Sequence, residues 1–336
     1  MKIKVPDYFN SFKCTADKCT DSCCIGWEIV IDDASMAKYK ALDHKIGREI
    51  CKKTTHGCFP LDENGRCAFL DEKGLCRIIS SLGDGYLCDI CREHPRYYGV
   101  GRDGIEGGIG LSCEAAAEII LSLDKRPEFT TINRDVNYYD EDDFADISDS
   151  LREILYHGIF TRGMYHGIFT RGMHELIGKY LAYAQAADDV AFNASTSGKS
   201  VKIPKVDYIP AENEEIRRML KYALTLFSEC EALTDKWNTL LERAGKVEIT
   251  TVLAKEKLTR PLIYYFTHRY VREGVEDMSL GARVLFALCS ALVITAISEV
   301  IDTDKSEIKS AVLFSKNIEY STDNVEYLLD GFSELL

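Results

Sequence analysis

The chain has 336 residues and a formal net charge of −13. This length is enough for one large domain or two ordinary ones, with a hydrophobic core that needs no cross-links. Residues 1–113 carry 16 Lys and Arg against 17 Asp and Glu, so nearly all of the negative charge lies in residues 114–336. This acidity excludes nucleic acid as the expected partner, because phosphates require a basic surface. It suits a protein with exposed lysines, although acidity can also serve solubility alone.

Two segments bear on localisation. The first twelve residues contain no apolar run of the kind that a secretory signal needs. The longest apolar run, Val284 to Ile297, is shorter than the roughly 20 residues that cross a bilayer, so it predicts a buried core helix. We therefore expect a cytoplasmic protein that does not enter a membrane. Its thiols would stay reduced, and structural disulfides would be rare.

The first third of the chain predicts short elements. Residues 27–31, WEIVI, indicate a short strand, and the pair Asp32 and Asp33 is a suitable N-cap for a helix over about 34–53. Residues 67–76 predict a hairpin with its turn at 72–74. That turn would place Cys67 and Cys76 opposite each other.

Residues 99–104, GVGRDG, match the glycine string of dinucleotide-binding folds. That string requires a preceding strand and a following helix, whose N-terminus holds the pyrophosphate. The residues that follow, IEGGIGL, have no helical period. We instead expect two strands joined at a turn over 102–104, and no nucleotide site.

From Cys113 onward the sequence predicts mainly helices, without strand-type alternation longer than a few residues. The expected helices lie near 212–243, 255–275, 280–301, 305–316 and 323–335. A loop is expected near 186–210, where Ser, Gly, Asn and Lys are mixed. The expected fold class is α+β, mainly α: a small Cys-rich head (1–125) with short strands and hairpins, packed on a larger helical body (126–336).

The nonapeptide YHGIFTRGM occurs twice without change, at 156–164 and 165–173. Nine residues are far fewer than a solenoid repeat contains. In a helix the two copies would face opposite sides, so His157 and His166 would not share a metal. We assign the repeat no chemistry and expect the extra copy to bulge or loop.

Eleven of the thirteen cysteines lie at or before Cys113, which is the strongest chemical signal in the chain. The odd total argues against a fully paired disulfide set. Thiolates suit zinc or an iron–sulfur cluster. However, only one C-x2-C pair is present, Cys88 with Cys91, and no standard metal motif is complete. We expect the neighbours Cys23 and Cys24 to serve two sites, or one ligand and one packing role, rather than one ion.

The remaining cysteines give weaker signals. Cys230 and Cys289 stand alone in helical segments and are expected to be buried packing residues. Cys51 and Cys58 show no ligand geometry. A histidine ligand is conceivable at two positions, His56 and His94.

The spacing of the cysteines and of their flanking residues carries a resemblance. The order F-x-C-x4-C-x3-C-C-x-G-W, C-x-F-L-x5-C, C-x3-P-R and L-S-C-E runs from Phe12 to Glu114, and it resembles the Cys-rich head of the flagellin lysine-N-methylase family. Segments 262–271 and 313–324 in the helical tail are similar as well, so the resemblance covers nearly the whole chain. Three cysteines and the tandem nonapeptide depart from the family pattern; the cysteines are Cys51, Cys58 and Cys88.

The resemblance implies methyl transfer from S-adenosylmethionine to the ε-amine of lysines on flagellin or another lysine-bearing protein. It also implies an iron–sulfur cluster, of the 4Fe–4S type, with zinc as the alternative metal. The expected metal ligands are four or more of eight cysteines: Cys14, Cys19, Cys23, Cys24, Cys67, Cys76, Cys91 and Cys113.

Three residues are candidates for binding the methyl donor and the substrate. Arg96 is suited to hold the donor's carboxylate, and Tyr97 or Tyr98 to line a lysine channel. Each is also explained by a salt bridge or by core packing. No sequence string identifies a catalytic residue. The alternative functions are a non-catalytic metal or iron–sulfur module that acts as carrier or scaffold, and a structural zinc protein with an acidic interaction body.

Overall fold

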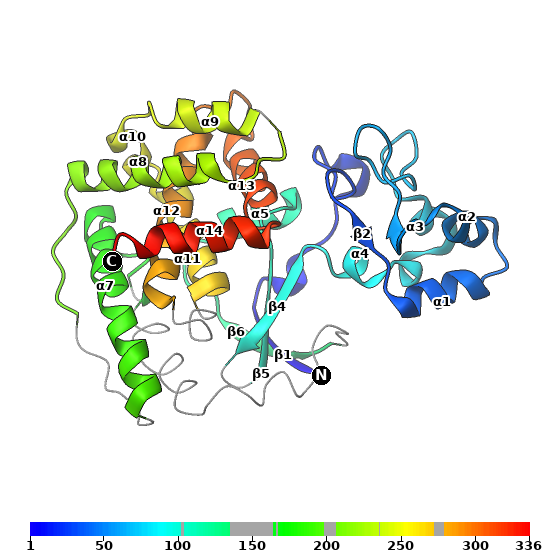
Figure 1. The fold of residues 1–336 in the computed structure, drawn as a ribbon, viewed down its shortest axis with the longest axis horizontal. Helices are drawn as coiled ribbons and strands as arrows, with labels where there is room; N and C mark the ends of the chain where they lie inside the picture. Colours follow the sequence, from blue (N-terminus) through cyan, green and yellow to red (C-terminus); the bar gives the residue numbers. More distant parts are fainter. Residues whose placement is uncertain (102–103, 135–163, 166, 198–205, 235, 272–278) are drawn as a thin grey trace.

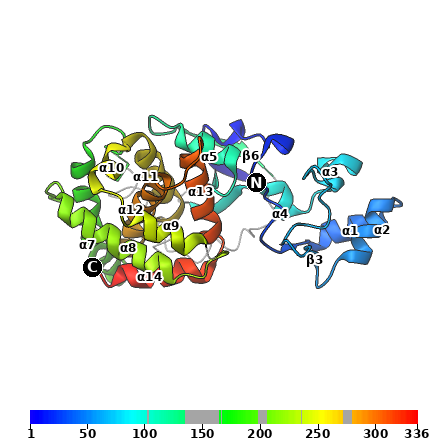
Figure 2. The same cartoon turned by 90° about the horizontal axis from the view of Figure 1, so that it is seen from above.

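The computed structural model describes residues 1–101, 104–134, 164–165, 167–197, 206–234, 236–271 and 279–336. Figure 1 shows a large helical body with a smaller lobe beside it. The two parts also stand side by side in the view turned by 90° in Figure 2. We call residues 14–93 the small lobe and the other described residues the body.

The small lobe consists of short elements. Its strands are β2 (Ile29–Val30) and β3 (Cys58–Phe59), which pair antiparallel. Its α-helices are α1 (Asp33–Ala41), α2 (Lys45–Lys53), α3 (Arg77–Leu82) and α4 (Asp89–Glu93). The helices α2 and α3 are tied by a two-pronged ion pair, in which the Arg77 guanidinium donates to both Glu49 oxygens at 3.0 and 2.6 Å.

A four-stranded sheet lies between the lobe and the helices of the body, in the order β4-β5-β1-β6. Its strands are β1 (Lys2–Pro6), β4 (Arg96–Gly101), β5 (Gly104–Ile109) and β6 (Phe129–Asn133). The strand β1 pairs in parallel with β5 and antiparallel with β6, and β4 pairs antiparallel with β5.

The body is otherwise helical. Its α-helices are α5 (Glu114–Leu121), α7 (Met173–Ser197), α8 (Asn213–Glu229), α9 (Lys236–Ala244), α10 (Ile249–Ala254), α11 (Glu256–Tyr270), α12 (Leu280–Ser298), α13 (Ser306–Asn317) and α14 (Thr322–Ser333). Helix makes up 56% of the structure and strand 11%, which confirms a mainly helical fold with a small sheet.

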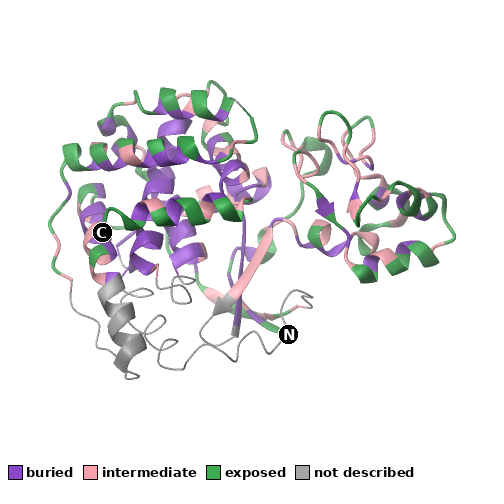
Figure 3. Ribbon diagram, in the orientation of Figure 1, coloured by how far each residue is buried: buried purple, intermediate pink, exposed green. Residues whose placement is uncertain are grey.

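The centre of the body is α12, in which every residue from Leu280 to Ser298 is buried. This helix packs against α7, α8, α9, α11, α13 and α14. Its length and apolar composition would allow it to cross a membrane, but its apolar stretch is entirely covered by protein. Figure 3 shows the resulting continuous buried interior. The prediction of a core helix at 284–297 is confirmed.

The lobe and the body have separate hydrophobic cores. The lobe core contains Ile29, Tyr39 and Phe69 among others. The body core includes Ile3 of β1 and Ile105 of β5 together with the helices, so the four-stranded sheet packs with the body. The predicted division of the chain into two domains, 1–125 and 126–336, stays a prediction.

The helix expected over 34–53 is two helices, α1 and α2. The predicted N-cap is confirmed, because the Asp32 side chain accepts a hydrogen bond from a backbone N–H of the first turn at 2.8 Å. The chain becomes extended at Leu42. His44 then starts α2, and its Nδ1 accepts a hydrogen bond from the Ile46 N–H at 3.2 Å. A side chain that caps a second helix favours this break over a continuous helix.

The helix expected over 212–243 is also two helices, α8 and α9. Between them Cys230 is extended, and the next backbone N–H, that of Glu231, donates to the Asn324 side chain at 2.9 Å. A side chain from α14 thus replaces the helical hydrogen bond. This contact is tertiary, so sequence periodicity does not reveal it.

The loop expected near 186–210 is wrong in its first half, because α7 continues to Ser197. The residues AQAADDVAF in this stretch are rich in alanine, the strongest helix former. Residues 198–205 lie outside the described residues, and 206–212 are not helical. The other predicted helices are confirmed as α11, α12, α13 and α14, except that the end of the first, 272–275, lies outside the described residues. The helix α10 was not predicted.

The sheet contains two strands that the sequence analysis missed, β1 and β6. They pair with each other over their whole length, from Lys2 opposite Asn133 to Pro6 opposite Phe129. Both are five residues long. In β6 no residue is fully buried, so it lacks the apolar alternation by which strands are recognised.

The glycine string at 99–104 lies in a β-hairpin, as predicted. The strands β4 and β5 pair in register from Arg96 opposite Ile109 to Gly101 opposite Gly104. The turn residues 102–103 lie outside the described residues. Since a strand and not a helix follows the string, the rejection of a dinucleotide fingerprint is supported by the backbone.

Glycines in β5 leave room for tyrosine rings of β4, and this leads to a stability prediction. Gly108 lies opposite Tyr97, and a Cβ atom on Gly108 would be 2.3 Å from the Tyr97 hydroxyl oxygen. That oxygen is 3.1 Å from Nδ1 of His268, so it is not free to move. We expect Gly108→Ala to lower the free energy of unfolding by about 1–3 kcal/mol, as measured by urea denaturation.

A second glycine serves as the control for this prediction. Gly85 has no atom within 4 Å of the position of an added Cβ, and its φ is not in the left-handed region. Gly85→Ala should therefore leave the unfolding midpoint nearly unchanged. Equal effects of the two substitutions would contradict the packing argument.

The tandem nonapeptide is described only in part. The first copy lies outside the described residues except for its last residue, and His157 and His166 lie outside them too. In the second copy, residues 167–172 form turns rather than a helix, with Gly167 at φ +97°. Ile168 is nevertheless fully buried in the body core.

Candidate thiol-rich site

Five cysteines of the small lobe gather around its core. Cys67 and Cys88 are buried members of that core, and Cys24, Cys76 and Cys91 pack against it. Their thiols are close enough for each to affect the ionisation of others in the group. All thirteen cysteines are free thiols.

Local backbone structure positions these thiols. The Cys67 N–H donates to the carbonyl of Cys24 at 2.8 Å, which joins two segments that are far apart in the sequence. Cys76 is bridged to Leu70 across the predicted turn, where Gly74 has φ +77°. The predicted turn at 72–74 is confirmed, but the two cysteines of the segment are not opposite each other, because Cys76 pairs with Leu70 and Cys67 pairs with Leu61. Cys88 stands at the N-cap of α4, and Cys91 follows in its first turn.

Two pairs of thiols are in direct contact. The Sγ atoms of Cys23 and Cys24 are 3.9 Å apart. The expectation that these neighbours serve two sites, or one ligand and one packing role, stays a prediction. Their hydrogen bond lowers the pKa of Cys23 and raises that of Cys24. Cys88 and Cys91 are also hydrogen-bonded, which lowers the pKa of Cys88 and raises that of Cys91.

A second group of thiols lies where the lobe meets the body. Cys19 and Cys23 come from the lobe, and Cys113 stands at the N-cap of α5 in the body. Glu114, directly after Cys113, accepts a hydrogen bond from the Thr20 N–H at 2.8 Å and so holds the two segments together. The pKa of the Cys113 thiol is raised to about 11, mainly by burial and to a smaller extent by the nearby Cys23 and Cys19 thiols.

A histidine and two aromatic rings border this junction. The ring of Trp27 stacks on that of Tyr320, with centroids 4.4 Å apart and planes inclined by 12°. The ring centroids of His94 and Trp27 are 5.7 Å apart, and the His94 Nδ1 is 3.3 Å from the Tyr320 hydroxyl. Burial lowers the pKa of His94 to about 4, so the imidazole is neutral at neutral pH.

Seven of the eight predicted ligand cysteines lie in one or the other of these two groups. These seven are Cys19, Cys23, Cys24, Cys67, Cys76, Cys91 and Cys113. The eighth, Cys14, is exposed. Cys88, which the sequence analysis left out, belongs to the lobe group, and its C-x2-C spacing with Cys91 was the signal for it. Cys51 is exposed on α2, and Cys58 is partly exposed on β3.

The fit of these residues to a metal is incomplete. Among the residues that the structure describes, no three His, Cys, Asp or Glu side chains lie close enough together to hold one ion. The donor set has the right chemistry, since several thiols meet in a half-buried place. Side-chain rearrangement would be needed to close a site around a metal, and we derive no reaction step through one.

Arg96, at the start of β4, has a buried hydrogen-bond donor that a ligand could use. Its guanidinium carbon lies 5.1 Å from the ring centroid of Phe12 and 5.5 Å from that of Phe9. Its Nε is buried and has no hydrogen-bond partner among the described residues. An orphaned buried donor next to aromatic rings is compatible with the predicted contact to a carboxylate.

Tyr97 and Tyr98 lie on opposite faces of β4, as successive residues of a strand do. Tyr97 points into the body, where Arg269 lies over its ring at 4.6 Å. Tyr98 shares a face with Arg96, and its hydroxyl donates to Glu93 at 2.7 Å. That one of the two tyrosines lines a lysine channel stays a prediction.

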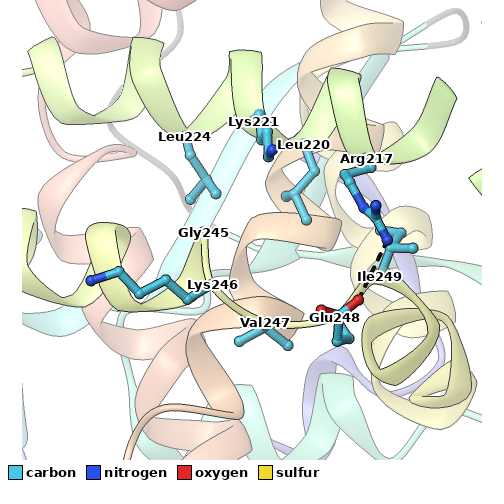
Figure 4. Close-up of a pocket in the computed structure, with 9 residues that line it drawn as sticks. All are labelled: Arg217, Leu220, Lys221, Leu224, Gly245, Lys246, Val247, Glu248 and Ile249. Atoms are coloured by element: carbon cyan, nitrogen blue, oxygen red, sulfur yellow. Dashed lines mark hydrogen bonds and ion pairs between the residues drawn. The ribbon is translucent and has the colours of Figure 1, made fainter. Parts of the chain in front are cut away.

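A groove on the surface of the body is lined by residues of α8 and of the segment that leads into α10 (Figure 4). The lining residues are Arg217, Leu220, Lys221, Leu224, Gly245, Lys246, Val247, Glu248 and Ile249. Arg217 is paired with Glu248 at 3.4 Å. Since the lining contains neither a thiol nor a histidine, we place the candidate site at the cysteines.

Comparison with known proteins finds relatives with flagellar names. The chain is 30% identical over 130 residues to flagellar biosynthetic protein FliU of Salmonella muenchen. The match covers 36% of this chain and 77% of that protein. The chain belongs to the flagellin lysine-N-methylase family. The predicted family is confirmed, whereas the shared Cys-rich head and a resemblance over nearly the whole chain stay predictions, because the match covers 36% of the chain.

Two further members of the family carry the name lysine-N-methylase, from Salmonella typhimurium and Salmonella choleraesuis. Each is 30% identical to this chain over 130 residues, 36% of the chain. The matched region covers 32% of each, so the chain spans about a third of the length of these lysine-N-methylases. No family model and no solved structure matches the chain.

Proposed function

We propose that the protein is a lysine N-methyltransferase that transfers methyl groups from S-adenosylmethionine to flagellin in the cytoplasm. The observation that carries the proposal is the 30% identity to two proteins named lysine-N-methylase. The name of the FliU relative supports a flagellar substrate. A lysine-rich partner also suits the charge of −13.

The chemistry makes two demands on the protein. The methyl donor must be held by its charged groups, and we propose Arg96 for the donor's carboxylate, with Tyr98 on the same face of β4. The substrate lysine must lose its proton before attack, because an ammonium is not a nucleophile. We assign no catalytic residue for that proton.

We further propose that the thiols bind an iron–sulfur cluster of the 4Fe–4S type, with zinc as the alternative metal. The support is the convergence of free cysteines from four separate segments in and beside the small lobe. When bound, such a group would supply a redox-active or structural centre. The proposal requires the side-chain rearrangement described above.

The experiment that tests the proposed function uses labelled S-adenosylmethionine and purified flagellin. A methylase transfers label to lysine side chains of flagellin. The alternative, a carrier or scaffold for a metal or cluster, gives up its metal to an acceptor protein and transfers no label. Label that fails to reach flagellin, together with transfer of iron to an acceptor, would favour the carrier.

Salt should affect binding of the substrate more than the chemical step. Charges on exposed surfaces are screened within roughly 10 Å at 0.1 M salt. Steady-state methylation of flagellin should therefore show KM rising with ionic strength while kcat stays nearly level. The acidic run at 140–149, which lies outside the described residues, is the first place to neutralise, by amide replacement of Asp140, Glu141, Asp142 and Asp143 together. A KM that responds neither to salt nor to this replacement would contradict charge-based recruitment.

A further inference from the structure

The end of α13 reaches across to the small lobe through a lysine. The ammonium of Lys316 lies 2.5 Å from a carboxylate oxygen of Asp21 and 3.3 Å from the backbone carbonyl of Ser22. The same ammonium lies 5.7 Å from the ring centroid of Trp27. A carboxylate, a carbonyl and an aromatic face together form a cation pocket on the lobe, and a side chain of the body fills it.

One turn further along, Tyr320 makes a second contact across the junction. Its ring stacks on the ring of Trp27 in the lobe. Its hydroxyl is 2.7 Å from the Ser112 Oγ in the body. The hydroxyl is also within 3.3 Å of Nδ1 of His94. Tyr320 therefore holds lobe and body at the same time, although 46% of its surface remains exposed.

These contacts have few others to support them. The hydrophobic cores of the lobe and the body share no residue. Besides the lysine and the tyrosine, Glu114 of the body holds Thr20 of the lobe. Glu93, at the end of the lobe where the chain crosses to the body, also pairs with Arg134 at 2.9 Å and accepts a hydrogen bond from the Tyr98 hydroxyl at 2.7 Å. The chain itself crosses between the parts near residues 13 and 94, which limits how far they separate but does not fix their orientation.

We propose that Lys316 and Tyr320 form a clamp that fixes the orientation of the small lobe on the body. The clamp presses the segment of residues 19–27 against α5, and so keeps the lobe thiols Cys19 and Cys23 beside Cys113 of the body. Lys316 and Tyr320 are thus positioning residues for the junction. This inference concerns the lobe and body alone and does not depend on the proposed methyl transfer.

The clamp should respond to salt, because half of it is an ion pair. The Lys316 side chain is 10% exposed and that of Asp21 is 34% exposed. Partly exposed ion pairs are weakened by salt and contribute modestly one at a time. Raising the ionic strength should therefore loosen the junction without unfolding either part.

Tryptophan fluorescence reports on this junction. The chain has two tryptophans. Trp237 is 1% exposed in the body core, so acrylamide scarcely reaches it, and quenching reflects Trp27. We expect Lys316→Met and Tyr320→Leu each to raise the acrylamide quenching constant about two-fold, because loss of one weak contact opens the junction for part of the time.

Matched variants separate the clamp from a general loss of stability. Lys309 is an exposed lysine on the same helix, so Lys309→Met should leave the quenching unchanged. Lys316→Arg should retain most of the protection, because it keeps the charge. Salt should raise the quenching of the wild type but not that of Lys316→Met.

The proposal is contradicted if quenching of the wild type is independent of salt and neither Lys316→Met nor Tyr320→Leu changes the quenching. In that case the clamp does not hold the lobe. Circular dichroism must show that the variants retain their helices. If a variant fails to fold, the salt titration of the wild type and Lys316→Arg still decide the question.

Discussion

Replacing Arg269 by methionine is expected to lower the free energy of unfolding by about 3–5 kcal/mol, because the change leaves a buried carboxylate without its cation. The Arg269 Nη1 lies 2.9 Å from Oε1 of Glu319, whose side chain is completely buried. The hydroxyls of Tyr265 and Tyr270 donate to the same oxygen at 2.7 and 3.0 Å. These hydroxyls alone cannot balance a buried negative charge.

Urea unfolding followed by the fluorescence of Trp237, which is buried in the body core, measures this effect. The matched control is Arg217→Met, since Arg217 is 41% exposed and its ion pairs with described residues are to two exposed glutamates. It should cost at most about 1 kcal/mol. The double variant Arg269→Met with Glu319→Leu should recover part of the loss. Equal costs at positions 269 and 217 would contradict the account of the buried pair.

Serine at Cys91 is expected to abolish iron binding, whereas serine at Cys230 or Cys289 should leave the metal content at the wild-type level. Cys91 lies against the lobe core in contact with Cys88, within the group of converging thiols. Cys289 is fully buried at the centre of α12, and Cys230 is buried in the body core. Burial raises the pKa of Cys230 to about 12, so it stays a thiol at neutral pH.

The measurement is the iron and acid-labile sulfide per chain after purification without oxygen. Single serine replacements of the predicted ligands should divide into cluster-losing and cluster-retaining sets. The exposed Cys14 is the predicted ligand that the structure places outside the converging group, so it is the first candidate for the retaining set. Loss of iron in either the Cys230 or the Cys289 variant would contradict the assignment. One equivalent of zinc without iron would contradict the cluster itself.

The elements that the sequence predicted well are those decided by local chemistry. Asp32 caps α1, and residues 99–104 form a hairpin because they lack helical periodicity. The apolar run at 284–297 lies in α12, the central helix of the body, as its composition indicates. The cap and the hairpin are decided by contacts between residues that are close in the sequence.

The elements that the sequence did not predict depend on distant partners. The strand β1 pairs with residues about a hundred positions away, and its five residues carry too little alternation to be recognised alone. The break between α8 and α9 depends on Asn324. Tertiary hydrogen bonds of this kind override local helical preference.

The candidate site shows the same division. The concentration of cysteines was visible in the sequence, but the grouping was not. Cys88 was set aside because it departs from the family pattern, yet the structure places it in the lobe core beside Cys67. Conversely, Tyr97 followed Arg96 in the sequence, but strand geometry turns it to the other face, toward His268.

The most direct test of the proposed function is the mass of flagellin after incubation with the purified protein and S-adenosylmethionine. Intact-protein and peptide mass spectrometry should show flagellin lysines heavier by whole methyl groups. Heat-inactivated protein should produce no such gain. If flagellin keeps its mass while the protein is folded and carries its metal, the assignment as a flagellin lysine N-methyltransferase is contradicted.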